Sequence, residues 1–197
     1  GIAGEPAAAV DPAAPATALF TSGSTGKPSA VVHTLANHLY SAIGSASNLP
    51  LKRDDRWLVA LPMSHVSGLS ILFRCLLAGA TALIARSGSF CNDDAQHLLP
   101  QTTRLSVVPA QLPRLLEVPA SQRSALRSVL VGGQAVPTEL IDRAQSERIP
   151  VLTTYGLTEM ASQIATAPPS ACLPQGVCGS VLPYRRLRVR DGQIEVG

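Results

Sequence analysis

The sequence predicts an α/β fold: a parallel or mixed sheet flanked by helices, with the start of a small all-β subdomain at the C-terminal end. Short β-rich runs alternate with helical patterns along most of the chain, which is typical of a sheet covered by helices. Some of these runs, such as 128–131, are almost entirely apolar, as expected for strands buried on both faces. From about Pro174 onward the helical patterns stop and only short strands follow.

The expected elements follow one another in alternation. Strands are predicted over 17–21, 57–61, 81–85, 105–108, 128–131 and 151–154. Helices are predicted between them, over 33–49, 67–77, 93–99, 110–116 and 138–148. Residues 1–16, which contain Pro and Ala with little pattern, are interpreted as a lead-in or linker, 17–173 as the α/β core, and 174–197 as the beginning of the β subdomain. Within that subdomain, Asp191-Gly192 predicts a two-residue hairpin turn between strands over 186–190 and 193–196.

The composition indicates a globular protein with a sizeable core. The 197 residues are 46% hydrophobic and 15% charged. The net charge of +3 is small and spread out, so it gives no support to nucleic-acid binding. In the one basic cluster, 185–190, arginines alternate with Leu187 and Val189, which favours the solvent face of a strand over a polyanion contact. No apolar run is long enough for a membrane span, and the N-terminal segment lacks the basic region of a signal peptide.

The four cysteines do not form a metal-binding or disulfide pattern. Cys75, Cys91, Cys172 and Cys178 include no CxxC pair and no Cys/His spacing of a zinc finger. Cys75 lies in an apolar run and is expected to be a buried thiol. Reduced cysteines of this kind are typical of a cytoplasmic protein.

A loop rich in hydroxyls and glycines follows the first predicted strand. Residues 21–28 read Thr-Ser-Gly-Ser-Thr-Gly-Lys-Pro. Glycines let backbone N–H groups approach an anion, and the hydroxyls add donors, so the loop predicts a phosphate cradle. Only two residues separate its glycines, which excludes a Walker loop. The alternative is a flexible Ser/Gly-rich turn.

Three more motifs follow predicted strands, where an α/β sheet places its ligands. They are residues 61–68 (Leu-Pro-Met-Ser-His-Val-Ser-Gly), 132–137 (Gly-Gly-Gln-Ala-Val-Pro) and 155–159 (Tyr-Gly-Leu-Thr-Glu). Each alone is a weak signal, because a Gly-Gly pair is usually a tight turn and a lone histidine is more often structural. A Gly-x-Ser-x-Gly elbow is absent from the sequence, which disfavours a hydrolase.

Together and in this order, the motifs resemble those of the adenylate-forming superfamily of acyl-CoA ligases, luciferases and peptide-synthetase adenylation domains. The resemblance extends from Leu19 to Gly197 and makes 17–173 a nucleotide- and acyl-binding core. It implies that a carboxylate attacks the α-phosphate of ATP, pyrophosphate leaves, and the acyl-adenylate then passes to coenzyme A. ATP, Mg²⁺ and coenzyme A are therefore the implied cofactor and co-substrates.

The resemblance also implies roles for individual residues. Catalytic roles fall to Thr158 at the α-phosphate, Glu159 as Mg²⁺ ligand, and His65 beside the acyl pocket. The implied nucleotide-binding residues are Thr21, Ser22, Gly23, Ser24, Thr25, Gly26, Lys27, Gly132, Gly133, Gln134, Ala135, Tyr155, Gly156, Leu157 and Thr158. Glu159 has the alternative of an ordinary helix-start glutamate. The superfamily commonly has a lysine where this chain has Ser29, so either Lys27 faces the pyrophosphate or it is a solvated loop residue.

A narrower resemblance rests on residues 64–68 and on Arg74, which lies inside an otherwise apolar predicted helix. Burying an arginine is costly unless it meets an anion, and its planar guanidinium suits a carboxylate. The combination resembles the o-succinylbenzoate–CoA ligases of menaquinone biosynthesis, whose substrate is a dicarboxylate, and implies substrate binding by His65, Ser67 and Arg74. The alternatives are an ion pair or a snorkelling position for Arg74, and helix capping for His65 and Ser67.

Two other functions remain open at this point. The acid is another aryl or acyl carboxylate, or the chain is a nucleotide-binding module without turnover. Compared with the superfamily, the sequence lacks the N-terminal subdomain before the phosphate loop, the Thr-Gly-Asp segment and the mobile C-terminal domain. We therefore expect a core fragment that is largely inactive alone, with the missing domains of the same enzyme as its partners.

Overall fold

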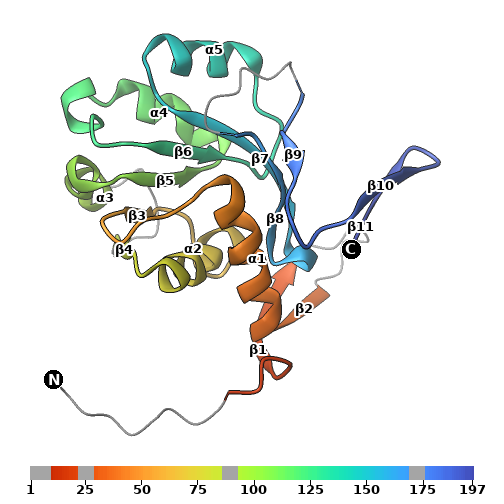
Figure 1. Ribbon diagram of the computed structural model, residues 1–197. Helices are drawn as coiled ribbons and strands as arrows, with labels where there is room; N and C mark the ends of the chain where they lie inside the picture. Colours follow the sequence, from red (N-terminus) through yellow and green to blue (C-terminus); the bar gives the residue numbers. More distant parts are fainter. Residues whose placement is uncertain (1–9, 22–28, 86–92, 169–175) are drawn as a thin grey trace, which may run out of the picture.

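The computed structural model describes residues 10–21, 29–85, 93–168 and 176–197. Its centre is a seven-stranded sheet with the strand order β4-β3-β5-β6-β7-β8-β9 (Figure 1). The strands are β3 (Arg56–Val59), β4 (Thr81–Ile84), β5 (Arg104–Val107), β6 (Ser128–Val131), β7 (Val151–Leu157), β8 (Ser162–Thr166) and β9 (Ser180–Val181). The first five run parallel, whereas β8 and β9 add antiparallel pairs. This mixed sheet confirms the predicted fold class.

Helices cover both faces of the sheet (Figure 1). One face packs against α1 (Leu35–Asn48) and α2 (Val66–Ala78), and the other against α3 (Asp93–Leu98), α4 (Leu112–Glu117) and α5 (Thr138–Ser146). Side chains alternate between the two layers, because successive residues of a strand point to opposite faces. Trp57 joins the cluster under α1 and α2, and its neighbour Leu58 joins the cluster under α3 to α5. The short 3₁₀ turns are η1 (Leu99–Gln101), η2 (Pro109–Gln111), η3 (Ala120–Gln122) and η4 (Thr158–Met160).

The first predicted strand has a different place from the one expected. β1 (Pro15–Thr21) pairs antiparallel with β2 (Ser29–Thr34) in a separate two-stranded sheet, so it is not part of the parallel sheet. The prediction missed β2 because its apolar residues merge with the helical pattern that follows. The helix begins only at Leu35, where Thr34 accepts a hydrogen bond from the backbone of Asn37 and forms a capping box.

The predicted strand over 151–154 was too short. Tyr155, Gly156 and Leu157 lie inside β7, where they pair with β8 rather than following the strand. The hairpin at the C-terminal end is confirmed: β10 (Leu187–Arg190) pairs with β11 (Gln193–Val196), and Asp191 and Gly192 have φ of 51° and 75°. Arg188 and Arg190 are exposed and lie near Glu195. β9 belongs to the main sheet, and the proposed boundaries at 16 and 174 stay predictions.

The amino ends of the central strands are held together by a buried carboxylate. Asp55, which is fully buried, accepts hydrogen bonds from the Lys52 N–H at 2.9 Å, Thr103 at 2.7 Å, and Arg104 and Arg127 at 3.1 Å each. Burial alone would raise the pKa of Asp55, but the bonds from Arg104, Lys52 and Thr103 outweigh it and lower the pKa. This cluster ties β3, β5 and β6 together at the end opposite to the candidate site.

Two of the cysteines lie in the described part of the chain. Cys75 is buried, as predicted, and burial raises the pKa of its thiol to about 11, while Cys178 is half-buried; both are free thiols. Cys91 and Cys172 lie outside the described residues.

Among the described helices, a segment with the length and apolar character of a membrane span is not found.

Candidate active site

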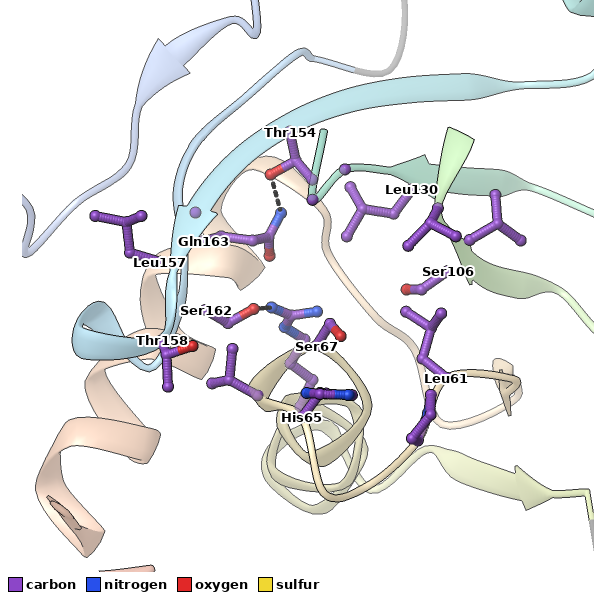
Figure 2. A pocket seen from close by; sticks show the side chains of 18 of the residues that line it. Leu61, His65, Ser67, Ser106, Leu130, Thr154, Leu157, Thr158, Ser162 and Gln163 are labelled. Atoms are coloured by element: carbon purple, nitrogen blue, oxygen red, sulfur yellow. Dashed lines mark hydrogen bonds between the residues drawn. The ribbon is translucent and has the colours of Figure 1, made fainter. Parts of the chain in front are cut away.

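A cavity of about 710 Å³ opens at the carboxyl ends of the central strands (Figure 2). We call it the main cavity. Its walls come from the segments that follow β3, β5 and β6, from the start of α2, and from β7, η4 and β8. An adjoining cavity of about 520 Å³ shares Gly133, Thr154, Gly156 and Leu157 with it. Described residues of the predicted motifs thus line these two cavities, at the edge of the sheet where the sequence analysis expected them.

The start of α2 presents the predicted acyl-side residues. His65 and Ser67 both line the main cavity (Figure 2). The helix begins at Val66, so His65 is in the N-cap position, but its side chain makes no capping hydrogen bond. Gly68 lets the preceding loop lie against the helix, because a Cβ here would come within 2.4 Å of the Pro62 carbonyl oxygen. The capping alternative is thus wrong for the His65 side chain.

Arg74 is the most distinctive side chain of the main cavity. It is buried, with 4% of its surface exposed, and burial lowers the pKa of its guanidinium to about 10. Its Nη2 donates to Ser162 Oγ at 3.0 Å (the dashed line at Ser162 in Figure 2), and Trp57 packs under its Cζ at 5.4 Å from the ring centroid. Within the described ranges, Arg74 forms no salt bridge and its Nε has no hydrogen-bond partner. A buried cation of this kind is suited to an anionic ligand.

Three polar residues that line the main cavity together with Arg74 were not predicted. Ser162 also accepts a hydrogen bond from Ser70 at 3.2 Å. Gln163 is buried, accepts from Ser45 at 2.7 Å and donates to Thr166 at 2.6 Å. Both belong to β8, a strand that the sequence did not reveal. The third, Ser106, accepts from the Trp57 indole at 3.2 Å and lies in a predicted strand, so its position was a usable signal.

The other predicted nucleotide residues divide between the two cavities. Thr21, Gly132, Thr158 and Glu159 line the main cavity. Gly133, Gly156 and Leu157 line both cavities, whereas Gln134, Ala135 and Tyr155 line the adjoining one. The loop residues Ser22, Gly23, Ser24, Thr25, Gly26 and Lys27 lie outside the described residues, so their roles stay predictions.

Glu159 is an exposed carboxylate and the one acidic residue among the described residues that line the main cavity. The described segments contain no cluster of three or more His, Cys, Asp or Glu side chains that could hold a metal ion alone. Mg²⁺ is commonly held by one or two carboxylates together with phosphate oxygens. A single carboxylate at the cavity wall therefore fits a magnesium ion that arrives with a nucleotide.

Comparison with known proteins decides the family. The family model described as "AMP-binding enzyme" matches residues 2–196. The chain belongs to this family. A 2-succinylbenzoate–CoA ligase from Bacillus licheniformis is 40% identical over 186 residues, which are 91% of this chain and 38% of the relative.

Solved structures give the same picture. The o-succinylbenzoate coenzyme A synthetase from Bacillus subtilis in complex with ATP and magnesium ion is 38% identical, with a TM-score of 0.82. The match covers 93% of this chain and 39% of that one. The same enzyme in complex with the acyl-adenylate intermediate OSB-AMP is also 38% identical, with a TM-score of 0.82 and coverage of 93% and 38%. The chain thus spans about two-fifths of the length of these proteins.

Proposed function

We propose that this chain forms the adenylation core of an AMP-forming acid–CoA ligase that acts on o-succinylbenzoate, within a protein of the relatives' length. The observation that carries the proposal is Arg74, a buried guanidinium at the main cavity with no carboxylate partner among the described residues. When one carboxylate of a dicarboxylate substrate reacts, the other is free to bind Arg74.

The free thiols Cys75 and Cys178 agree with a cytoplasmic location.

The acid end of the site lies around Arg74. Arginine binds a carboxylate through two parallel N–H···O bonds, which fixes orientation as well as charge. Ser106 and Gln163 add polar groups close to this end, while Leu61, Leu130 and Val107 supply apolar wall for an aromatic ring. His65 lies at the edge of the cavity, where its ring limits the space for the acyl group (Figure 2).

We place the nucleotide end at η4 and the end of β7, where Thr158 lies on the side of the cavity opposite to Ser106 (Figure 2). We infer that Thr158 contacts the α-phosphate and that Gly133, Gln134 and Ala135 line one face of adenine, with Tyr155 on the other. Glu159 would hold Mg²⁺, which, when bound, neutralises phosphate charge.

In the proposed reaction, an oxygen of the free substrate carboxylate attacks the α-phosphorus of ATP and the bond to pyrophosphate breaks. The thiol of coenzyme A then attacks the acyl carbon of the adenylate and AMP leaves. Because both first reactants are anions, the contribution of these residues is to hold the two in line and to balance charge.

Calorimetric titration of the 197-residue chain tests the proposal. The ligands are ATP with Mg²⁺, o-succinylbenzoate, and a monoacid analogue lacking one carboxylate. We expect Arg74→Ala to weaken o-succinylbenzoate binding about a hundredfold and to leave ATP binding within about twofold. The monoacid should bind both forms equally weakly. The control is Arg114→Ala, which removes an exposed arginine on α4 and should change neither affinity.

The outcomes separate the candidate functions. Equal o-succinylbenzoate binding by wild type and Arg74→Ala would overturn the assignment of the acid. Binding of ATP with no response to any acid would favour a nucleotide-binding module. In a protein of the relatives' length, pyrophosphate release that depends on o-succinylbenzoate is the corresponding test of turnover.

A further inference from the structure

We propose that His33 is a positioning residue that fixes the Thr158–Glu159 turn to the hairpin bordering residues 22–28. The inference rests on the proposed function, since it concerns how the nucleotide end of that site is assembled. His33 lies on β2 and Thr158 lies 125 residues later in the chain. Sequence motifs alone do not connect the two.

The hydrogen bond at His33 has a defined direction. Its Nε2 lies 2.7 Å from the Thr158 carbonyl oxygen, and the side chain is 2% exposed. A carbonyl oxygen only accepts, so Nε2 carries the hydrogen and donates it. Nδ1 of His33 is buried and has no partner within the described part of the chain. Among the described residues, the His33 ring therefore makes this one hydrogen bond.

The turn is held from three directions. η4 and the residue after it present three carbonyl oxygens to side chains of other segments. Thr158 accepts from His33, Met160 accepts from Arg185 Nη2 at 2.8 Å, and Ala161 accepts from Ser41 Oγ at 2.7 Å. Ala161 has φ of 51°, a left-handed conformation that needs support from its surroundings. The turn that carries Thr158 and Glu159 is thus fixed by its backbone, which leaves both side chains for the cavity.

His33 differs from the other two donors in what it connects. Ser41 belongs to α1 and Arg185 to the segment before β10, whereas His33 belongs to the β1–β2 hairpin. That hairpin is a separate two-stranded sheet, and none of the strands that the structure describes pairs it with the main sheet. Residues 22–28 lie between β1 and β2 in the sequence, so the His33 bond joins the hairpin that borders the phosphate-loop motif to the turn of the Thr158 motif.

A neighbouring histidine supplies a matched control. His38 on α1 is also buried; its ring lies 5.1 Å from that of His33 and stacks on Phe73. Its Nε2 bonds to Thr17 at 2.8 Å, and none of its hydrogen bonds reaches η4. Burial, followed by the charge of His33, lowers the pKa of His38 to about 4. Replacing it tests the loss of a buried histidine without loss of the η4 contact.

The experiment measures binding of ATP with Mg²⁺ to the chain by calorimetry, with thermal unfolding in parallel. We expect His33→Ala to weaken binding about tenfold, the effect of one buried hydrogen bond. His33→Gln, whose amide nitrogen reaches the former Nε2 position, should restore affinity to within about threefold. His38→Ala should lower the unfolding midpoint and leave affinity within about twofold.

A double-mutant cycle provides a second readout. Because His33 acts in part through the position of Thr158, the affinity losses of His33→Ala and Thr158→Ala should be clearly less than additive in the double variant. Additive losses, or equal losses of affinity in His33→Ala and His38→Ala that follow the loss of stability, would overturn the inference. A wild-type chain that binds ATP but not o-succinylbenzoate would count against the proposed function alone, since the His33 comparison needs no acid.

Discussion

Two buried arginines lie at opposite ends of the same sheet, and they differ in whether a carboxylate of the described chain lies beside them. Arg104, at the amino end of β5, forms a salt bridge with the fully buried Asp55 at 3.1 Å. Arg74, at the carboxyl end, meets a serine hydroxyl and an indole ring but no carboxylate among the described residues. The chain neutralises one cation itself and leaves the other beside a cavity. We propose that the difference separates a structural charge from a charge kept for a ligand.

The amino end is self-contained. The Asp55 carboxylate receives hydrogen bonds from two arginines, a threonine and a backbone N–H. Arg104 also donates to Ser128 and to the Pro50 carbonyl, both at 3.1 Å. Removing one partner of a buried ion pair leaves the other charge buried and unpaired, which destabilises the fold. A buried charge that has no carboxylate partner is already unpaired, so removing it adds no such destabilisation. The comparison therefore predicts opposite effects of mutation at the two ends.

The largest expected effect is at Asp55. Asp55→Ala should lower the free energy of unfolding by about 3–5 kcal/mol, because it leaves Arg104 buried without its counter-ion. Urea-induced unfolding followed by circular dichroism measures this. The control is Asp54→Ala on the same loop: Asp54 is exposed and pairs with Arg127, so we expect a change of less than about 1 kcal/mol. Equal effects of the two substitutions would contradict a special role for the buried pair.

The sequence predicted the amino-end strands more easily than the contacts between them. Alternation of apolar runs with helical patterns located β3 to β7 and the helices on both faces, since burial on both sides imposes a continuous apolar run. The pairing of Asp55 with Arg104 joins residues 49 apart, and no local pattern encodes that distance. β2 was not predicted, because its apolar residues continue directly into the pattern of the helix that Thr34 caps.

At the carboxyl end, the motifs pointed to His65, Arg74 and Thr158, and all three line the main cavity. Ser162 and Gln163 escaped prediction because β8 is a short polar-apolar strand that follows a 3₁₀ turn and has no signal of its own. Arg74 was singled out by a local conflict, a charge in an apolar helix, and the structure places it against the cavity. Such conflicts between pattern and residue type are expected at functional sites.

An intermediate effect is expected at Ser162, which connects Arg74 to the sheet. Its φ of 111° is strained for a residue with a Cβ. Ser162→Ala and Ser162→Gly both remove the hydroxyl that accepts from Arg74, and each should weaken o-succinylbenzoate binding about fivefold. They should differ in stability: the glycine variant should be about 1 kcal/mol more stable than the alanine variant, because glycine adopts positive φ freely. A more stable alanine variant would show that this backbone is not strained.

The smallest expected effect is the one that most sharpens the comparison. Arg74→Met removes a buried charge that has no carboxylate partner among the described residues, and methionine keeps an unbranched chain and a polarisable sulfur against Trp57. We expect the free energy of unfolding to change by less than about 1 kcal/mol, or to rise, because the lost hydrogen bond and cation–π contact are offset by relief of an uncompensated buried charge. Arg104→Met, measured in the same urea series, should lower the free energy of unfolding by about 3 kcal/mol, since it removes the buried cationic partner of Asp55 and leaves only the half-exposed Arg127. A loss at Arg74 as large as that at Arg104 would mean that both arginines support the fold, and the distinction between the two ends of the sheet would fail. A neutral Arg74→Met that no longer binds o-succinylbenzoate would show a cation retained for its ligand rather than for the fold.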